Sequence, residues 1–216
     1  MMKIVSLNVG KPKMVQMDGK EVETGYYKKP VQDEIYLAKL NFEGDGQAEA
    51  YHGGVDKAVC VYPYEHYPYW EQQLNRKLPA VAFGENVTVT GMLETDVHIG
   101  DTFSIGQAIV QITQPRRPCH KIAGRHAVKD LTARVLNSGY TGYYLRVLEE
   151  GSVGPDSLIE RLSIDPGQIS VAFANDSLYR NKNNMDDIRR ILEVGALSES
   201  WRLKFSTKLE KLTASL

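Results

Sequence analysis

Residues 97–106 read Val97-His98-Ile99-Gly100-Asp101-Thr102-Phe103-Ser104-Ile105-Gly106, two short strand-like runs that each end at a turn containing glycine. Similar runs at 86–90 and 108–113 lie on either side, and residues 3–9 alternate between apolar and polar types. The 28–40 region has the spacing of another strand or pair of strands. Short strands separated by turn residues predict a small, closed, mainly antiparallel β-barrel rather than alternating strands and helices.

Two further segments complete the expected barrel. The run Thr141-Gly142-Tyr143-Tyr144-Leu145-Arg146-Val147-Leu148 predicts a strand that returns to the sheet and ends at Glu149-Glu150-Gly151. A helix is expected from Tyr64 to about Arg76, with Pro63 suited to its first turn and Pro68 causing a kink or a late start.

The apolar spacing changes from two to near 3.6 after Pro155 and Pro166-Gly167. We therefore expect a barrel domain over residues 1–160 and a three-helix domain over residues 168–216. Ser170 is predicted to cap the first helix and Ser198 the third. The apolar residues of these helices, at Met185, Ile188, Leu192, Trp201, Phe205, Leu209 and Leu212, are explained by packing of the helices together or onto the barrel.

Composition limits the classes of partner. The 216 residues carry 26 Lys and Arg against 27 Asp and Glu, a net charge of −1. No general field attracts nucleic acid or an anionic membrane, so an anionic ligand must be held by a local pocket. The two cysteines do not form the disulfide framework typical of small secreted proteins, and the sequence shows no signal peptide. It also lacks the run of about 18 apolar residues that a membrane-spanning helix requires. The sequence therefore predicts a cytoplasmic protein.

The segment Gln114-Pro115-Arg116-Arg117-Pro118-Cys119-His120-Lys121 holds the strongest chemical signal. Its two prolines stiffen the loop, and Arg116, Arg117, Lys121 and a protonated His120 favour the thiolate of Cys119 over the thiol. A thiolate is a nucleophile and a metal ligand. The alternative is a small buried side chain that happens to follow proline, but burying so many cations for packing alone is costly.

Two glycine-containing segments are weaker candidates. His52-Gly53-Gly54-Val55-Asp56-Lys57 combines glycines that let backbone N–H groups approach an anion with one cation and one carboxylate, or it is simply a tight turn. In Phe83-Gly84-Glu85-Asn86 the last two side chains either orient a heterocycle or begin a strand. The five histidines match no zinc motif.

Taken in order, these segments resemble the MOSC family, the domain found at the C-terminus of molybdenum-cofactor sulfurases and in stand-alone bacterial proteins. The matching stretches are 52–59, 83–86, 100–101, 114–119 and 141–151. The tail after residue 168 is similar to the extension of the YiiM-like stand-alone members. Many members carry a second histidine where this chain has Tyr51. The resemblance implies a mainly β fold, a mixed or antiparallel MOSC β-barrel with a small C-terminal three-helix domain.

The resemblance also implies that Cys119 contacts the molybdenum or sulfur of a molybdopterin-type cofactor, as catalytic residue and metal ligand. A soft thiolate suits that metal, and the cofactor's phosphate requires cationic or backbone N–H donors. The expected cofactor-binding residues are His52, Gly53, Gly54, Asp56, Lys57, Glu85, Asn86, Arg116 and Arg117, with Arg116 and Lys57 as partners of the anion.

For YiiM-like proteins the implied activity is that of a molybdenum-dependent oxidoreductase that reduces N-hydroxylated bases and related hydroxylamines, small-molecule substrates, with electrons from a separate flavin-containing reductase. Family annotation adds pyridoxal phosphate binding, for which no lysine shows a Schiff-base context. Two alternatives remain open: a sulfur carrier that holds a persulfide on Cys119 for delivery to a metal centre, and a non-catalytic barrel that binds pterin or a partner protein.

Overall fold

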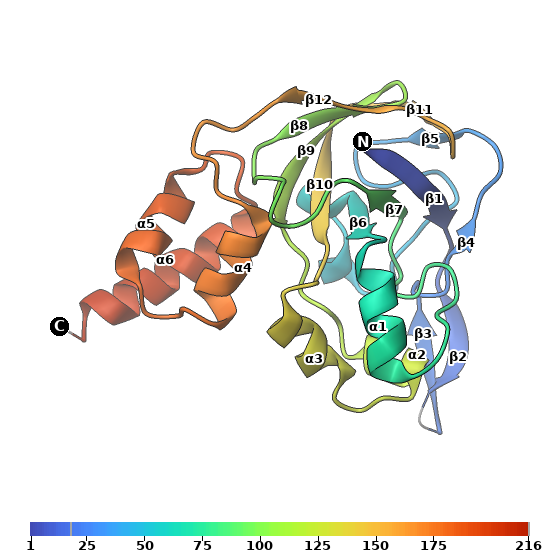
Figure 1. Cartoon of the computed structure of the whole chain (residues 1–216), viewed down its shortest axis with the longest axis horizontal. Coiled ribbons are helices and arrows are strands. Elements are labelled where there is room, and N and C mark those ends of the chain that lie inside the picture. The colour runs from blue at the N-terminus through green and yellow to red at the C-terminus, as the bar shows by residue number, and fades with distance from the viewer. Residues whose placement is uncertain (18, 216) are drawn as a thin grey trace.

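The computed structural model describes residues 1–17 and 19–215 and shows a curled mixed β-sheet, helices against it and a helical C-terminal segment (Figure 1). The largest sheet contains, in spatial order, β12 (Ile159–Ser163), β8 (Thr102–Ile105), β9 (Ala108–Pro115), β10 (Tyr143–Glu149), β6 (Val59–Pro63), β7 (Val87–Thr90), β1 (Lys3–Val9) and β4 (Lys29–Pro30). Its neighbouring strands are antiparallel except for β6 and β7, which run parallel. The predicted mainly β, barrel-like fold is confirmed.

The parallel pair follows from the crossover between its two strands. After β6 the chain forms α1 (His66–Leu74) and returns in the same direction as β7. Every residue of β6 is buried, as expected for a strand covered on both faces. Pro68 stands in the first turn of α1, where its missing N–H costs no hydrogen bond, so the expected late start is confirmed. The predicted place of Pro63 is wrong, because Pro63 ends β6.

The sheet curls around an apolar core formed by the inward faces of its strands, but the expected closure is wrong, because the edge strands β12 and β4 do not pair with each other. Leu7, Val61, Val87, Phe103 and Ile112 are among the side chains that meet there, each no more than 1% exposed. Alternation along β8 places Phe103 and Ile105 inside and Thr102 and Ser104 partly outside. Burial of this core is the main stabilising contribution to the barrel.

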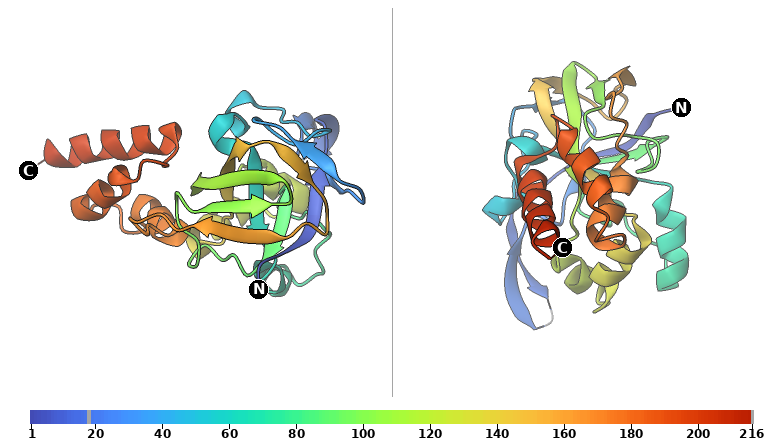
Figure 2. Two further views of the ribbon diagram at one scale, coloured as in Figure 1. Left: turned by 90° about the horizontal axis from the view of Figure 1, so that it is seen from above. Right: turned by 90° about the vertical axis from the view of Figure 1, so that its left-hand side faces the viewer.

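The C-terminal segment consists of α4 (Val171–Tyr179), α5 (Met185–Glu193) and α6 (Glu199–Thr213) around their own apolar cluster. The predicted caps are confirmed: the Ser170 hydroxyl accepts from the Phe173 N–H at 3.0 Å and the Ser198 hydroxyl from the Trp201 N–H at 3.3 Å. Figure 2 shows α6 extending away from the barrel, while its first residues are tied to the sheet, where the Ser198 N–H donates to the Thr113 carbonyl at 3.1 Å.

Several elements differ from the sequence expectations. A hairpin of β2 (Lys13–Met17) and β3 (Lys20–Thr24) and the helices α2 (Lys121–His126) and α3 (Leu131–Ser138) were not predicted. Residues 97–99 form no strand and contribute one isolated bridge, from His98 to Ser170. The 28–40 region does form two short strands, β4 and β5 (Ile35–Leu37), the latter paired with β11 (Gly151–Val153).

In the part of the chain that the structure describes, no helix combines the length and the apolar character needed to cross a membrane. The division into domains at 1–160 and 168–216 stays a prediction.

Candidate functional site

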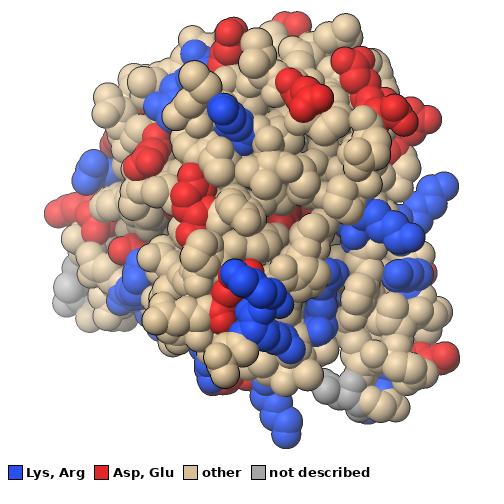
Figure 3. Space-filling model, turned by 45° about the vertical axis from the view of Figure 1, so that its right-hand side comes forward, with Lys and Arg blue, Asp and Glu red and all other residues tan. Residues whose placement is uncertain are grey.

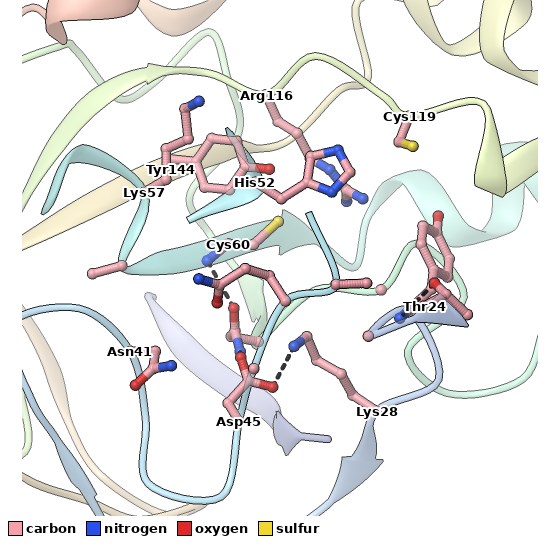
Figure 4. Close-up of a pocket in the computed structure, with 18 of the residues that line it drawn as sticks. Thr24, Lys28, Asn41, Asp45, His52, Lys57, Cys60, Arg116, Cys119 and Tyr144 are labelled. Carbon is pink, nitrogen blue, oxygen red and sulfur yellow. Dashed lines mark hydrogen bonds and ion pairs between the residues drawn. The ribbon is translucent and has the colours of Figure 1, made fainter. Parts of the chain in front are cut away.

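A cavity of about 720 Å³, open to solvent at its mouth, lies at one end of the sheet (Figure 4). Its walls come from the end of β3, the loop before η1 (Ala50–His52), β6, and the loop between β9 and α2. The side chains that carry its chemistry are Tyr26, Lys28, Asp45, His52, Lys57, Cys60, Asn86, Arg116, Arg117, Cys119, Lys121 and Tyr144. Segments far apart in the sequence therefore meet at this site.

The charge of the cavity wall is strongly positive. Among the described residues, five Lys or Arg side chains line it against one carboxylate, Asp45, which is already ion-paired with Lys28 and accepts from the Gly10 N–H at 2.9 Å. Lys121 donates to Glu49 at 3.0 Å from the edge of the site. Side chains of both signs are spread over the outer face in Figure 3, and the whole chain has a net charge of −1. The positive potential is thus local, which suits an anionic ligand.

Arg116 is a buried cation that no carboxylate among the described residues pairs with. The residue is 7% exposed, its side chain lies within hydrogen-bond reach of Tyr144, and its guanidinium lies 5.8 Å from the ring centre of Tyr26. Its backbone N–H is fixed by the Gly142 carbonyl at 2.9 Å. A buried guanidinium without a carboxylate or carbonyl partner is costly, and an anion in the cavity would satisfy it.

Cys119 lies on the predicted loop between β9 and α2 and is partly exposed, with its sulfur 3.7 Å from Nδ1 of His120. Figure 4 shows the thiols of Cys60 and Cys119 and the side chain of Arg116 on the cavity wall. Burial raises the pKa of the Cys60 thiol, so this second cysteine stays protonated. Among the described residues no three His, Cys, Asp or Glu side chains converge as a metal site.

His52 and Lys57 both line the cavity, as the sequence predicted. Burial, followed by the nearby charges of Arg116 and Lys121, lowers the pKa of His52 to about 4, so the ring is neutral at neutral pH. Burial also lowers the pKa of Lys57, whose ammonium donates to the Tyr51 carbonyl at 2.7 Å. His52 can therefore act as a neutral hydrogen-bonding group and Lys57 as a cation.

The two glycines between His52 and Lys57 shape the local turn and do not form part of the cavity wall. Gly54 has a φ of +105°, which glycine adopts without strain, and joins η1 to η2 (Val55–Lys57). A Cβ on Gly53 would meet the side chain of Gln47 at 2.4 Å. Neither Gly53 nor Gly54 lies among the residues that line the cavity.

Asp56 also points away from the cavity. Its carboxylate accepts from Arg146 at 2.6 Å and from the Glu199 N–H at 3.1 Å, and its carbonyl accepts from Thr113 at 2.7 Å. The side chain thus joins the turn that carries Lys57 to β10 and to the start of α6.

Glu85 and Asn86 take different positions. Glu85 is fully buried outside the cavity, where it accepts from Tyr67, from the Phe83 N–H at 3.0 Å and from Thr88 at 2.9 Å. Asn86 does line the cavity, but its amide accepts from the Cys60 N–H at 3.0 Å and donates to Asp45 at 2.8 Å. Asn86 therefore orders the cavity floor.

The lining residues that sequence reasoning missed include Tyr26, Lys28, Asp45, Cys60 and Tyr144. Tyr144 belongs to a predicted strand next to β9, so its place beside the loop of Cys119 could have been inferred from strand pairing. No local signal places Lys28 there, because its position depends on the path of the chain after the unpredicted hairpin.

The sequence matches two family descriptions: the MOSC domain over residues 48–160 and the YiiM-like, 3-alpha helix domain over residues 169–212. It is 51% identical over 210 residues to "Uncharacterized protein YflK" of Bacillus subtilis, covering 97% of this chain and 95% of that protein. It is 34% identical over 195 residues to "Protein YiiM" of Escherichia coli, covering 86% and 87% of the two chains.

Two more similarities extend this set. The crystal structure of YiiM from Geobacillus stearothermophilus superposes with a TM-score of 0.84 at 38% identity, covering 97% of this chain and all of that one. A protein of Gibberella moniliformis named "Reductase" is 31% identical over 151 residues, which are 66% of this chain and 27% of that longer protein.

Proposed function

Because the chain belongs to the MOSC domain family and carries the YiiM-like three-helix domain, we propose that its cation-lined cavity binds the molybdenum cofactor and that the protein reduces N-hydroxylated compounds. The observation that supports this most is the buried side chain of Arg116, which no carboxylate among the described residues pairs with, in the same cavity as Cys119. The reductase name of a relative agrees with the reaction class.

The residues present fit such a cofactor. Its phosphate would be held by Arg116, which lines this cavity and forms charge-assisted hydrogen bonds with phosphate oxygens, while Lys57 and Arg117 lie at its border with a neighbouring cavity. Cys119 would supply one soft thiolate to the metal. Since the described residues form no cluster of three metal-ligating side chains, the remaining ligands would be the cofactor's own sulfur atoms.

The bound cofactor would supply two-electron transfer at its metal. Reduction of an N-hydroxylated group breaks the N–O bond, consumes two electrons and two protons, and releases the amine and water. A separate flavin-containing reductase is the proposed electron donor. His52, neutral at neutral pH, would donate or accept a hydrogen bond in the cavity without adding to its positive charge.

The test uses protein produced in a host that synthesises the cofactor. After gel filtration, molybdenum is measured by mass spectrometry, and reduction of an N-hydroxylated base is followed with an artificial electron donor. Wild-type protein is expected to retain the metal and turn over substrate, whereas Cys119→Ser loses turnover and Arg116→Met loses cofactor. Wild-type protein free of molybdenum would contradict the proposal, and so would full activity of the Cys119→Ser variant.

A sulfur carrier is the second candidate, favoured by the partial exposure of Cys119 to a neighbouring open cavity, from which another molecule can reach it. This function predicts a persulfide adduct about 32 Da heavier, the mass of one sulfur atom, on wild-type protein only. Intact-protein mass spectrometry distinguishes the two functions.

A further inference from the structure

A second cavity of about 1150 Å³, open to solvent, adjoins the first and shares part of its wall. The shared residues are His52, Lys57, Arg117, Cys119 and Tyr144. Cys119 thus belongs to both walls, and a ligand in either cavity would border this residue.

The C-terminal segment completes the wall of the second cavity. Ser200 and Lys204 of α6 line it, opposite Thr132 and Leu136 of α3. Ser200 donates to the Gln114 side chain at 3.0 Å, which fixes the first turn of α6 against β9. Residues four apart share one face of a helix, so Lys204 follows Ser200 toward the cavity.

The lining of this cavity carries positive charge that no carboxylate among the described residues of the lining offsets. Lys57, Arg117 and Lys204 come from three separate segments, and no Asp or Glu is found among the described residues that line it. Burial, followed by the charges of Arg117 and Lys57, lowers the pKa of Lys204, which is the effect expected where cations face a common space. A dianion would relieve this repulsion more fully than a single carboxylate.

The remaining lining suits a ring. Tyr51 and Tyr144 supply aromatic surface, and Pro118 and Leu136 supply apolar surface. A ligand that fits both parts has a planar heterocycle and a phosphate group, as a nucleotide does. A neutral free base would leave the three cations unpaired.

We infer that the second cavity is the substrate site and that it selects N-hydroxylated nucleoside monophosphates over the corresponding free bases and nucleosides. This inference rests on the proposed function for the reaction itself. Its physical basis is that one cavity is lined by Cys119, by three cations and by a surface suited to a ring. Lys204 contributes to this lining because α6 packs against the barrel.

The test is an equilibrium titration of cofactor-loaded protein with adenosine 5′-monophosphate and with adenosine, which are the reduced products of the N-hydroxylated compounds and cannot be reduced further in this way. Calorimetry is expected to show the monophosphate binding at least tenfold more tightly, since one charge-assisted hydrogen bond corresponds to about a factor of ten. Lys204→Ala should lose about fivefold or more for the monophosphate and leave adenosine unchanged.

Lys208, one turn farther along α6 and outside this lining, provides the matched control, and Lys208→Ala should bind like wild type. Equal affinities for the two analogues would overturn the inference, as would equal losses in the two lysine variants. If the monophosphate binds cofactor-free protein but not cofactor-loaded protein, the cofactor itself occupies this cavity, and that result would also overturn the inference. Because calorimetry measures binding and needs no turnover, failure of this inference can be distinguished from failure of the proposed reduction.

Discussion

Replacing Arg116 by methionine is expected to stabilise the ligand-free protein and to remove its response to phosphate. The residue is 7% exposed and no carboxylate among the described residues pairs with its guanidinium, so folding removes much of its water without supplying an opposite charge. Methionine has a similar length, carries no charge and fits irregular space.

The magnitude follows from that loss of water. Burial of an uncompensated ion costs several kcal/mol, part of which is recovered here through cavity water and the ring of Tyr26, so Arg116→Met should gain about 2 kcal/mol. For a chain of 216 residues this raises Tm by about 4–8 °C. An anion at one hundred times its Kd stabilises wild type by about 2.7 kcal/mol, or about 5–11 °C.

The assay is a thermal melt of cofactor-free protein with increasing inorganic phosphate. Wild type should melt at rising temperature, and Arg116→Met should start higher and shift little. Arg117→Met, at an exposed position on the same loop, is the control and should leave the ligand-free Tm nearly unchanged. A ligand-free Arg116→Met protein less stable than wild type by 1 kcal/mol or more, with its phosphate response intact, would refute the reasoning.

Three other outcomes are expected. Iodoacetamide at neutral pH should label Cys119 and spare Cys60, which is buried with a raised pKa; peptide mass spectrometry checks this, and preferential labelling of Cys60 would contradict it. His52 has a pKa near 6.5 in the unfolded chain and about 4 in the folded protein. As the pH falls from 6.5 to 4, the free energy of unfolding of wild type should therefore decrease by about 1–2 kcal/mol relative to His52→Asn, after allowance for solvent screening of the half-buried ring. Parallel urea titrations across that range would show no such difference if the folded pKa were ordinary. Asp56→Ala leaves Arg146 without its carboxylate and should cost about 1–3 kcal/mol in urea unfolding, and an unchanged midpoint would argue against the contact.

Local chemistry made much of the fold predictable. The strand at 102–105 and the caps at Ser170 and Ser198 depend on short-range alternation and hydroxyl placement, and both occur as expected. The hairpin of β2 and β3 carried a usable signal, the pair Asp18-Gly19 between two strand-like runs. The α2 segment, KIAGRH, contains a glycine and shows little periodicity, so its helix depends on packing of Ile122.

The candidate site was predictable only where residues adjacent in sequence act together. Arg116, Arg117 and Cys119 share one loop, and the structure keeps them in one cavity with His52 and Lys57. Glu85 shows the limit of such reasoning, because a carboxylate next to a glycine reads alike whether it faces a ligand or accepts from buried donors.

The outward direction of α6 also matters for handling the protein. Its first turns lie against the barrel and the second cavity, while its later turns pack with the other C-terminal helices and lead away from both (Figure 2). An affinity tag, a fluorophore or an electrode linker attached beyond Thr213 would therefore leave the cavity mouths open. The N-terminal half of the same helix offers no such freedom, because a graft there would displace Lys204 and detach the segment that Ser198 ties to β9.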